Sequence, residues 1–116
     1  MPELLIAHVE IPSTDLDRSS LFFNKIFDWK FRAFGNGYLL FNNQKGIMVG
    51  LRKVDNVETG DTTVFHVNIK DIDDVLKKAK ENGGKVKREK TVIPAMGWYA
   101  LLTDPDGNTI GLYQRS

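Results

Sequence analysis

The sequence contains no cysteine, which excludes a disulfide framework, a thiolate nucleophile and a cysteine-ligated zinc site. Long apolar runs are also missing, so no stretch could span a bilayer, and the amino terminus lacks the pattern of a signal peptide. From these absences we expect a soluble, cytoplasmic protein.

The chain has almost no net charge, because 16 basic and 15 acidic residues give a formal charge of +1. Such a balance provides no global field for holding nucleic acid or an anionic membrane. The basic stretch at 85–90 is therefore interpreted as a solvated strand that resists edge pairing. We expect the partner to be a small organic molecule, with no nucleic acid and no membrane.

The sequence repeats itself at half its length. His8 and Ile11 in an early apolar run align with His66 and Ile69 in a later one, at an offset of 58. Each run is followed by an acidic helix start, and a fixed internal repeat of this kind indicates a duplicated unit. We expect one domain over 1–116, with module one at about 4–53, a linker at 54–61 and module two at about 62–115.

The spacing of apolar residues predicts the same order in both modules, a strand, a helix and three more strands. Pro12 is expected to end the first strand, and Ser13 or Thr14 to cap the first helix. Trp29 is interpreted as a packing residue. The predicted strands lie at 4–11, 29–34, 38–41, 47–53, 62–69, 86–93, 98–103 and 109–115, and the predicted helices at about 15–28 and 71–82.

Several segments in this order carry a family resemblance: the His8 strand, residues 22–29, the His66 strand, residues 82–84 and Asp104-Pro105-Asp106-Gly107-Asn108. Together they resemble the vicinal oxygen chelate superfamily of glyoxalases, extradiol dioxygenases and bleomycin-resistance proteins. The chain looks most similar to the lactoylglutathione-lyase-related branch. The resemblance implies an α+β fold in which two βαβββ modules form a cup-shaped mixed sheet with helices on its outer face. It also implies a homodimer whose clefts hold a divalent metal.

The resemblance further implies the residues of that metal site. The family takes one ligand from the first strand and one from the last strand of each module, commonly two His and two Glu. Here the first-strand positions are His8 and His66, and the last-strand positions are Gly50 and Gly111. Because both carboxylates are missing, we expect no firmly held cofactor, and two imidazoles alone would bind a divalent metal weakly.

Residues two apart on a strand share a face, so strand alternation names further residues of the cleft. Glu10 is a candidate catalytic group beside His8 and His66, or an exposed strand end. Arg52 would bind a substrate anion or only solvent. Glycine at positions 50 and 111 is expected to enlarge the cup. The predicted ligand-binding residues are Glu10, Met48, Gly50, Arg52, Asn68, Trp98, Tyr99, Gly111 and Tyr113, with one of Trp98 and Tyr99 facing the ligand.

Three functions stay open at this point. We favour a small-molecule binding protein of the glyoxalase and bleomycin-resistance type, with or without turnover of a small organic substrate, that lacks the full His/Glu metal site. The first alternative is a metal-dependent lyase or dioxygenase-like enzyme with an atypical metal site. The second is a non-catalytic structural or regulatory module. The same frame hosts many activities, so resemblance in fold cannot choose among them.

Overall fold

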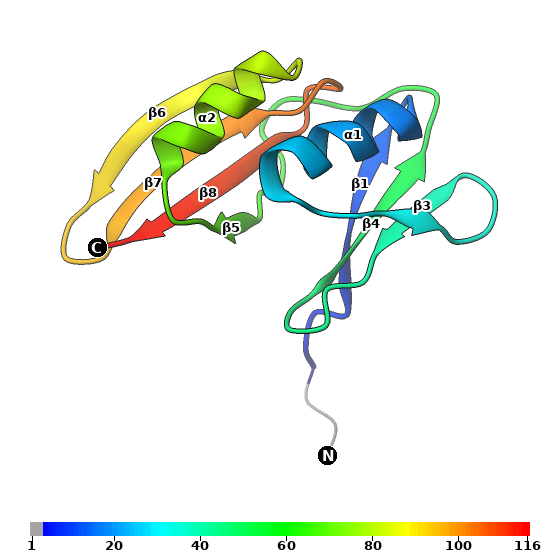
Figure 1. Cartoon of the computed structure of the whole chain (residues 1–116), viewed down its shortest axis with the longest axis horizontal. Helices are drawn as coiled ribbons and strands as arrows, with labels where there is room; N and C mark the ends of the chain where they lie inside the picture. The colour runs from blue at the N-terminus through cyan, green and yellow to red at the C-terminus, as the bar shows by residue number, and fades with distance from the viewer. Residues whose placement is uncertain (1–3) are drawn as a thin grey trace.

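The computed structural model describes residues 4–116, and its elements follow the predicted order twice (Figure 1). The predicted duplication of a βαβββ unit is therefore confirmed. The elements of module one are β1 (His8–Ser13), α1 (Leu16–Phe27), β2 (Arg32–Ala33), β3 (Tyr38–Phe41) and β4 (Met48–Lys53). Those of module two are β5 (His66–Asn68), α2 (Ile72–Glu81), β6 (Lys85–Ile93), β7 (Gly97–Thr103) and β8 (Thr109–Arg115).

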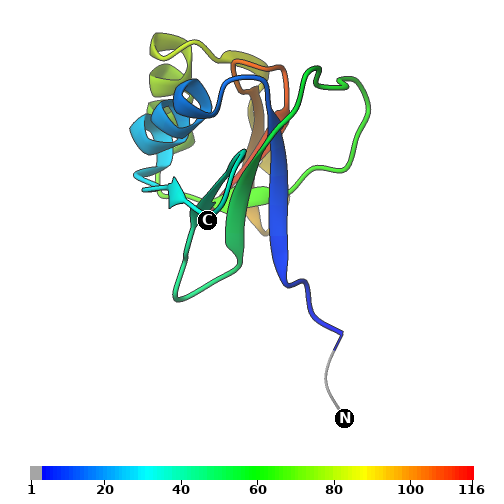
Figure 2. The ribbon, with the colours of Figure 1, turned by 90° about the vertical axis from the view of Figure 1, so that its right-hand side faces the viewer.

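The strands form two four-stranded mixed sheets, in the orders β1-β4-β3-β2 and β5-β8-β7-β6. In each sheet the first strand runs parallel to the last strand of its module, and the other pairs are antiparallel. Both helices lie on the same side of the sheets (Figure 2). The predicted α+β class is confirmed. No helix of residues 4–116 is long and apolar enough to cross a membrane.

The first helix begins one residue later than the sequence suggested. Asp15 is its N-cap, with a carboxylate that accepts a hydrogen bond from the Arg18 amide, so the predicted cap at Ser13 or Thr14 is wrong. Ser13 instead ends β1 and bonds the Ser19 hydroxyl. The second helix follows the prediction closely, because Asp71 caps it and accepts from the Asp74 amide.

Strand β1 differs from the predicted strand at both ends. Residues 4–7 lie outside it, and it continues through Pro12 and Ser13, where the sequence suggested a break. Proline is tolerated because β1 is an edge strand with a single neighbour, β4. Two other predicted strands are shorter in the structure, since β2 covers only Arg32–Ala33 and β5 only His66–Asn68.

Strand β2 is short because the residues before it belong to an aromatic cluster between α1 and the sheet. The Trp29 ring stacks on Phe23 at 5.8 Å and on Phe41 at 5.4 Å between ring centroids. Phe31 joins the cluster at 6.5 Å from Trp29. The interpretation of Trp29 as a packing residue is confirmed. This cluster fixes β3, whose opposite face carries part of the candidate site.

The two modules share one hydrophobic core, and the predicted core face of the first strands is confirmed. Ile11 is buried, and Val9, Val67 and Ile69 pack against the buried cluster. Alternation then places His8, Glu10 and His66 on the opposite faces of the sheets, which no helix of residues 4–116 covers.

A half-buried turn at 104–108 joins the modules. The Asp106 carboxylate accepts hydrogen bonds from the amide and hydroxyl of Thr14 and from the Arg18 guanidinium, all in module one. The side-chain amide of Asn108 donates to the Pro12 carbonyl at 2.9 Å. Burial raises the pKa of Asp104, which lies at the base of the turn. Burial alone would also raise the pKa of Asp106, but its bonds to Thr14 and Arg18 hold it below the usual value.

Candidate functional site

Three rows of paired residues build the exposed face of the module-one sheet. Residues directly opposite each other on neighbouring strands share a face. The register pairs His8 with Met48, Glu10 with Gly50 and Tyr38 with Arg52. The structure therefore brings together five predicted site residues on this face, namely His8, Glu10, Met48, Gly50 and Arg52.

Three of these side chains form a hydrogen-bonded cluster. The His8 Nε2 lies 3.3 Å from one oxygen of the Glu10 carboxylate, and the Arg52 Nε donates to the other oxygen at 3.2 Å. The hydrogen bond to His8 is the main cause that lowers the pKa of Glu10, although burial acts in the opposite direction. Glu10 is thus a paired carboxylate. The charge of Arg52 is compensated within the chain, which argues against Arg52 as a free anion-binding group.

Sequence reasoning missed Tyr38 on this face. Its hydroxyl lies so close over Gly50 that a Cβ at position 50 would overlap it. Burial, followed by the neighbouring Glu10 charge, raises the pKa of Tyr38. The signal was present, because β3 was predicted at its observed bounds and hairpin pairing with β4 puts Tyr38 opposite Arg52. The residues predicted by alternation came only from the first and last strand of each module, and Tyr38 lies on β3, between them in the chain.

A pocket of about 310 Å³ opens beside the cluster. It is lined by Phe34, Leu40 and Met48 together with the side chains of His8 and Tyr38, and its exposed surface is almost entirely apolar. Apolar walls with a few convergent polar groups are typical of sites for small organic ligands, and this volume is at the lower end of their range. The pocket therefore has room for a fragment-sized, mainly apolar molecule.

The module-two face is built in the same way. His66 pairs with Gly111, which pairs with Leu101, and Asn68 pairs with Tyr113, which pairs with Tyr99. His66, Asn68, Tyr99, Gly111 and Tyr113 therefore share a face, as predicted from alternation.

Trp98 points to the other side of this sheet. It packs against the hydrophobic core, and the Lys90 ammonium lies 4.7 Å from its ring. Of the predicted pair, Tyr99 shares the face with His66 and Trp98 does not. Trp98 and Tyr99 are adjacent in the strand, and successive side chains point to opposite faces of a sheet.

The two histidines do not occupy equivalent positions. His66 lies opposite Gly111, and its counterpart opposite Gly50 is Glu10. The helix caps agree, because Asp71 follows Asp15 by 56 residues and His66 follows Glu10 by the same 56. The structural offset between the modules is therefore 56 residues, and the offset of 58 is wrong by two. The faces assigned to His8 and His66 are unaffected, because side chains two residues apart on a strand point to the same side.

Neither glycine enlarges the cleft. A Cβ at Gly50 would overlap Tyr38, and a Cβ at Gly111 would overlap the His66 ring. The expectation of two vacated side-chain volumes is therefore wrong. Glycine at these positions lets Tyr38 and His66 lie flat over the backbone of the neighbouring strand.

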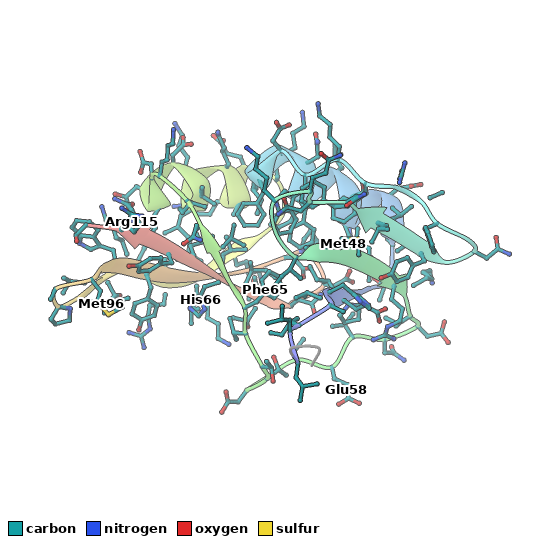
Figure 3. All side chains as sticks on the ribbon, turned by 90° about the horizontal axis from the view of Figure 1, so that it is seen from below. Met48, Glu58, Phe65, His66, Met96 and Arg115 are labelled. Atoms are coloured by element: carbon teal, nitrogen blue, oxygen red, sulfur yellow. The ribbon has the colours of Figure 1, made fainter. Side chains whose placement is uncertain are left out.

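The residues present do not fit the divalent metal that the resemblance implied. Within residues 4–116, no group of three or more His, Asp or Glu side chains converges as a metal site would require. His8 and His66 lie on different sheets, and Figure 3 shows His66 and Met48, the strand partner of His8, in different halves of the molecule. The Nε2 of His8 is also engaged with Glu10.

A larger cavity of about 670 Å³ lies at the seam between the modules. Its walls are the β1 edge, residues 58–65 and the start of β8, and Glu10 is the single predicted site residue that lines it. The cavity is bigger than the module-one pocket, but His8, Tyr38, Arg52 and His66 all lie outside its lining. We therefore place the candidate site on the two sheet faces.

A family model described as the Glyoxalase/Bleomycin resistance protein/Dioxygenase superfamily matches residues 5–112. Among curated proteins, a "Glyoxylase-like domain-containing protein" from Didymella fabae is 25% identical over 120 residues. The match covers 95% of this chain and 93% of that protein.

Solved structures share the fold at low sequence identity. A glyoxalase/bleomycin resistance protein/dioxygenase family enzyme from Burkholderia phytofirmans PsJN has a TM-score of 0.82 at 13% identity, and the match covers 95% of this chain and 98% of that one. The fosfomycin resistance protein FosX from Listeria monocytogenes, complexed with Mn(II) and sulfate ion, has a TM-score of 0.83 at 16% identity. That match covers 99% of this chain and 93% of FosX.

Proposed function

The chain belongs to the glyoxalase/bleomycin resistance protein/dioxygenase superfamily, and we propose that it binds a small organic molecule without a full His/Glu metal site. The observation that carries this proposal is the module-one pocket of about 310 Å³ beside the paired Glu10 carboxylate. Members of the superfamily bind small molecules, and FosX is one with metal and anion in place. In this chain the module-one sheet face carries the hydrogen-bonded cluster of His8, Glu10 and Arg52, and not a group of side chains that converge on a metal.

The apolar walls of the pocket favour a ligand with a ring. The polar side chains at the pocket favour a hydroxyl or carbonyl group on that ligand. Burial, followed by the nearby Glu10 charge, raises the pKa of Tyr38, so its hydroxyl keeps its proton at neutral pH and is a hydrogen-bond donor. The His8 Nε2 is shared with Glu10, which orients the imidazole toward the pocket it lines. A planar alcohol or phenol matches these contacts.

We expect Met48→Trp to weaken the binding of 2-naphthol by about tenfold or more, because the larger ring occupies the apolar part of a small pocket. Met96→Trp is the matched control, since Met96 is 57% exposed and lies outside the pocket lining. Methyl NMR titration and fluorescence measure the affinity and locate the contact at Met48. Equal affinity in both variants, or shifts confined to the seam residues 58–65, would contradict the proposed site.

We also propose that the protein is a homodimer. Leu4, Leu5 and Ile6 are exposed at 100%, 76% and 69%, and the segment projects from the body of the molecule (Figures 1 and 2). Contiguous exposed apolar side chains are typical of association surfaces. Sedimentation velocity is expected to give roughly twice the chain mass. A monomer at all concentrations would refute the assembly while leaving the pocket proposal intact.

A further inference from the structure

Strand β6 carries a basic segment whose placement the sequence did not predict. The β6 register against β7 shifts between Val86 and Arg88 and again between Arg88 and Thr91. Val86 packs against the core, whereas the shift puts Arg88 opposite Leu101. Bulges of this kind redirect side chains from one face to the other. They place Arg88 on the same face as His66, instead of leaving it on the helix side.

A continuous row of paired residues crosses this sheet from Arg88 through Leu101 and Gly111 to His66. The next row contains Tyr99 and Tyr113. Paired residues across adjacent strands point to the same side. The module-two face therefore combines a guanidinium, an imidazole and two phenol rings.

The salt bridges of residues 4–116 include neither of the two cations on this face. Arg88 and Lys87 form no ion pair with any residue of 4–116, in contrast to Arg52, which is paired with Glu10. The Lys87 ammonium donates to the Thr109 hydroxyl at 3.0 Å, which holds it toward β8. Within the basic stretch, Lys87 and Arg88 therefore bring positive charge to this sheet face, whereas Lys90 lies on the other side near Asp73 and Trp98.

An aromatic surface lies beside these cations. The Arg88 guanidinium carbon is 6.0 Å from the centre of the Tyr99 ring, and the Tyr99 and His66 ring centroids are 6.5 Å apart. Tyr113 is anchored by its hydroxyl, which donates to the Met96 carbonyl at 2.7 Å. Aromatic faces beside a guanidinium suit a ligand that is both planar and negatively charged.

We propose that the module-two face binds a small aromatic carboxylate, with the ligand ring against Tyr99 and His66 and its charged end at Arg88. A guanidinium matches the two oxygens of a carboxylate, and Lys87 adds positive potential nearby. This site uses none of the residues of the module-one pocket, so it adds a second binding function to the one proposed above.

The test titrates the full chain with benzoate and with benzamide, its neutral counterpart, followed by NMR of the Tyr99 ring and by calorimetry. Benzoate is expected to bind more tightly than benzamide. Arg88→Gln is expected to weaken benzoate binding by about tenfold, the usual scale for losing a charge-assisted hydrogen bond. Lys90→Gln is the matched control, because it removes the same charge from the same strand on the opposite face.

Loss of benzoate affinity in Arg88→Gln with retention in Lys90→Gln supports the proposal. Equal losses in the two variants, equal affinity for benzamide, or no saturable benzoate binding would overturn it. Binding of 2-naphthol to the module-one pocket is expected to be unchanged in Arg88→Gln. The two binding proposals are therefore tested independently of each other.

Discussion

Replacing Phe23 by Ala is expected to lower the free energy of unfolding by about 3–5 kcal/mol. Phe23 is 0% exposed, and its ring contacts Phe22 at 5.2 Å, Trp29 at 5.8 Å and Phe27 at 6.2 Å between centroids. Removing it leaves a cavity that rigid aromatic neighbours cannot close. Since a small domain has a total stability of about 5–15 kcal/mol, the loss is a large fraction of it.

Urea unfolding measures this change, and Leu21→Ala is the control on the same helix. Leu21 is 57% exposed, so its truncation is expected to change stability by no more than about 0.5 kcal/mol. Phe23→Ala should also weaken 2-naphthol binding, because the aromatic cluster supports β3, the strand that carries Tyr38. Similar stability of the two variants would mean that the cluster is not the centre of the module-one core.

The elements that the sequence predicted best are those whose signals are local. The 71–82 helix combines an aspartate cap, a regular apolar spacing and Gly83 at φ 94°, and it was placed within one residue at each end. The cap of α1 was misplaced because Ser13 and Thr14 have equally good capping side chains. Their hydroxyls bond other partners instead, Ser13 to Ser19 one turn into the helix and Thr14 to Asp106 far along the chain.

The candidate site was predictable where a face follows from period-two alternation. Glu10, His8 and Arg52 were assigned to one side of their strands, and the structure joins Glu10 to His8 by a hydrogen bond and to Arg52 by an ion pair. The pairing itself was not predictable, because it depends on the register between β1 and β4. The reorientation of Arg88 was equally hidden, since bulges depend on how two strands meet and leave no periodic signal.

The turn at 104–108 shows how a family motif acts physically. Asp104 accepts hydrogen bonds from the amides of Asp106 and Asn108, which closes the turn. Asp106 then points to module one and bonds Thr14 and Arg18. The motif therefore sets the orientation of one module relative to the other, and with it the positions of the two sheet faces.

Asp106→Asn is expected to lower the free energy of unfolding at pH 7 by about 2–3 kcal/mol. The Asp106 side chain is 5% exposed and forms an ion pair with Arg18 at 2.8 Å. An amide nitrogen in place of one oxygen would face the Thr14 amide, which is also a donor. Urea unfolding checks the value, with Asp55→Asn in the exposed connection as a control for the loss of one negative charge.

The pH dependence identifies the charge as the cause. Because the pKa of folded Asp106 lies below its ordinary value, near 3.8, its stabilisation is complete above that value and is lost as the pH falls through the folded pKa. The difference between the wild type and Asp106→Asn should therefore be largest near neutral pH and shrink below about pH 4. Burial raises the pKa of Asp104, which acts in the opposite direction. The Asp106 charge adds to that rise, so the difference between the two proteins reports the Asp106 charge together with its effect on Asp104. A difference that stays constant from pH 7 to pH 3 would show that packing, and not the Arg18 ion pair, holds the modules together.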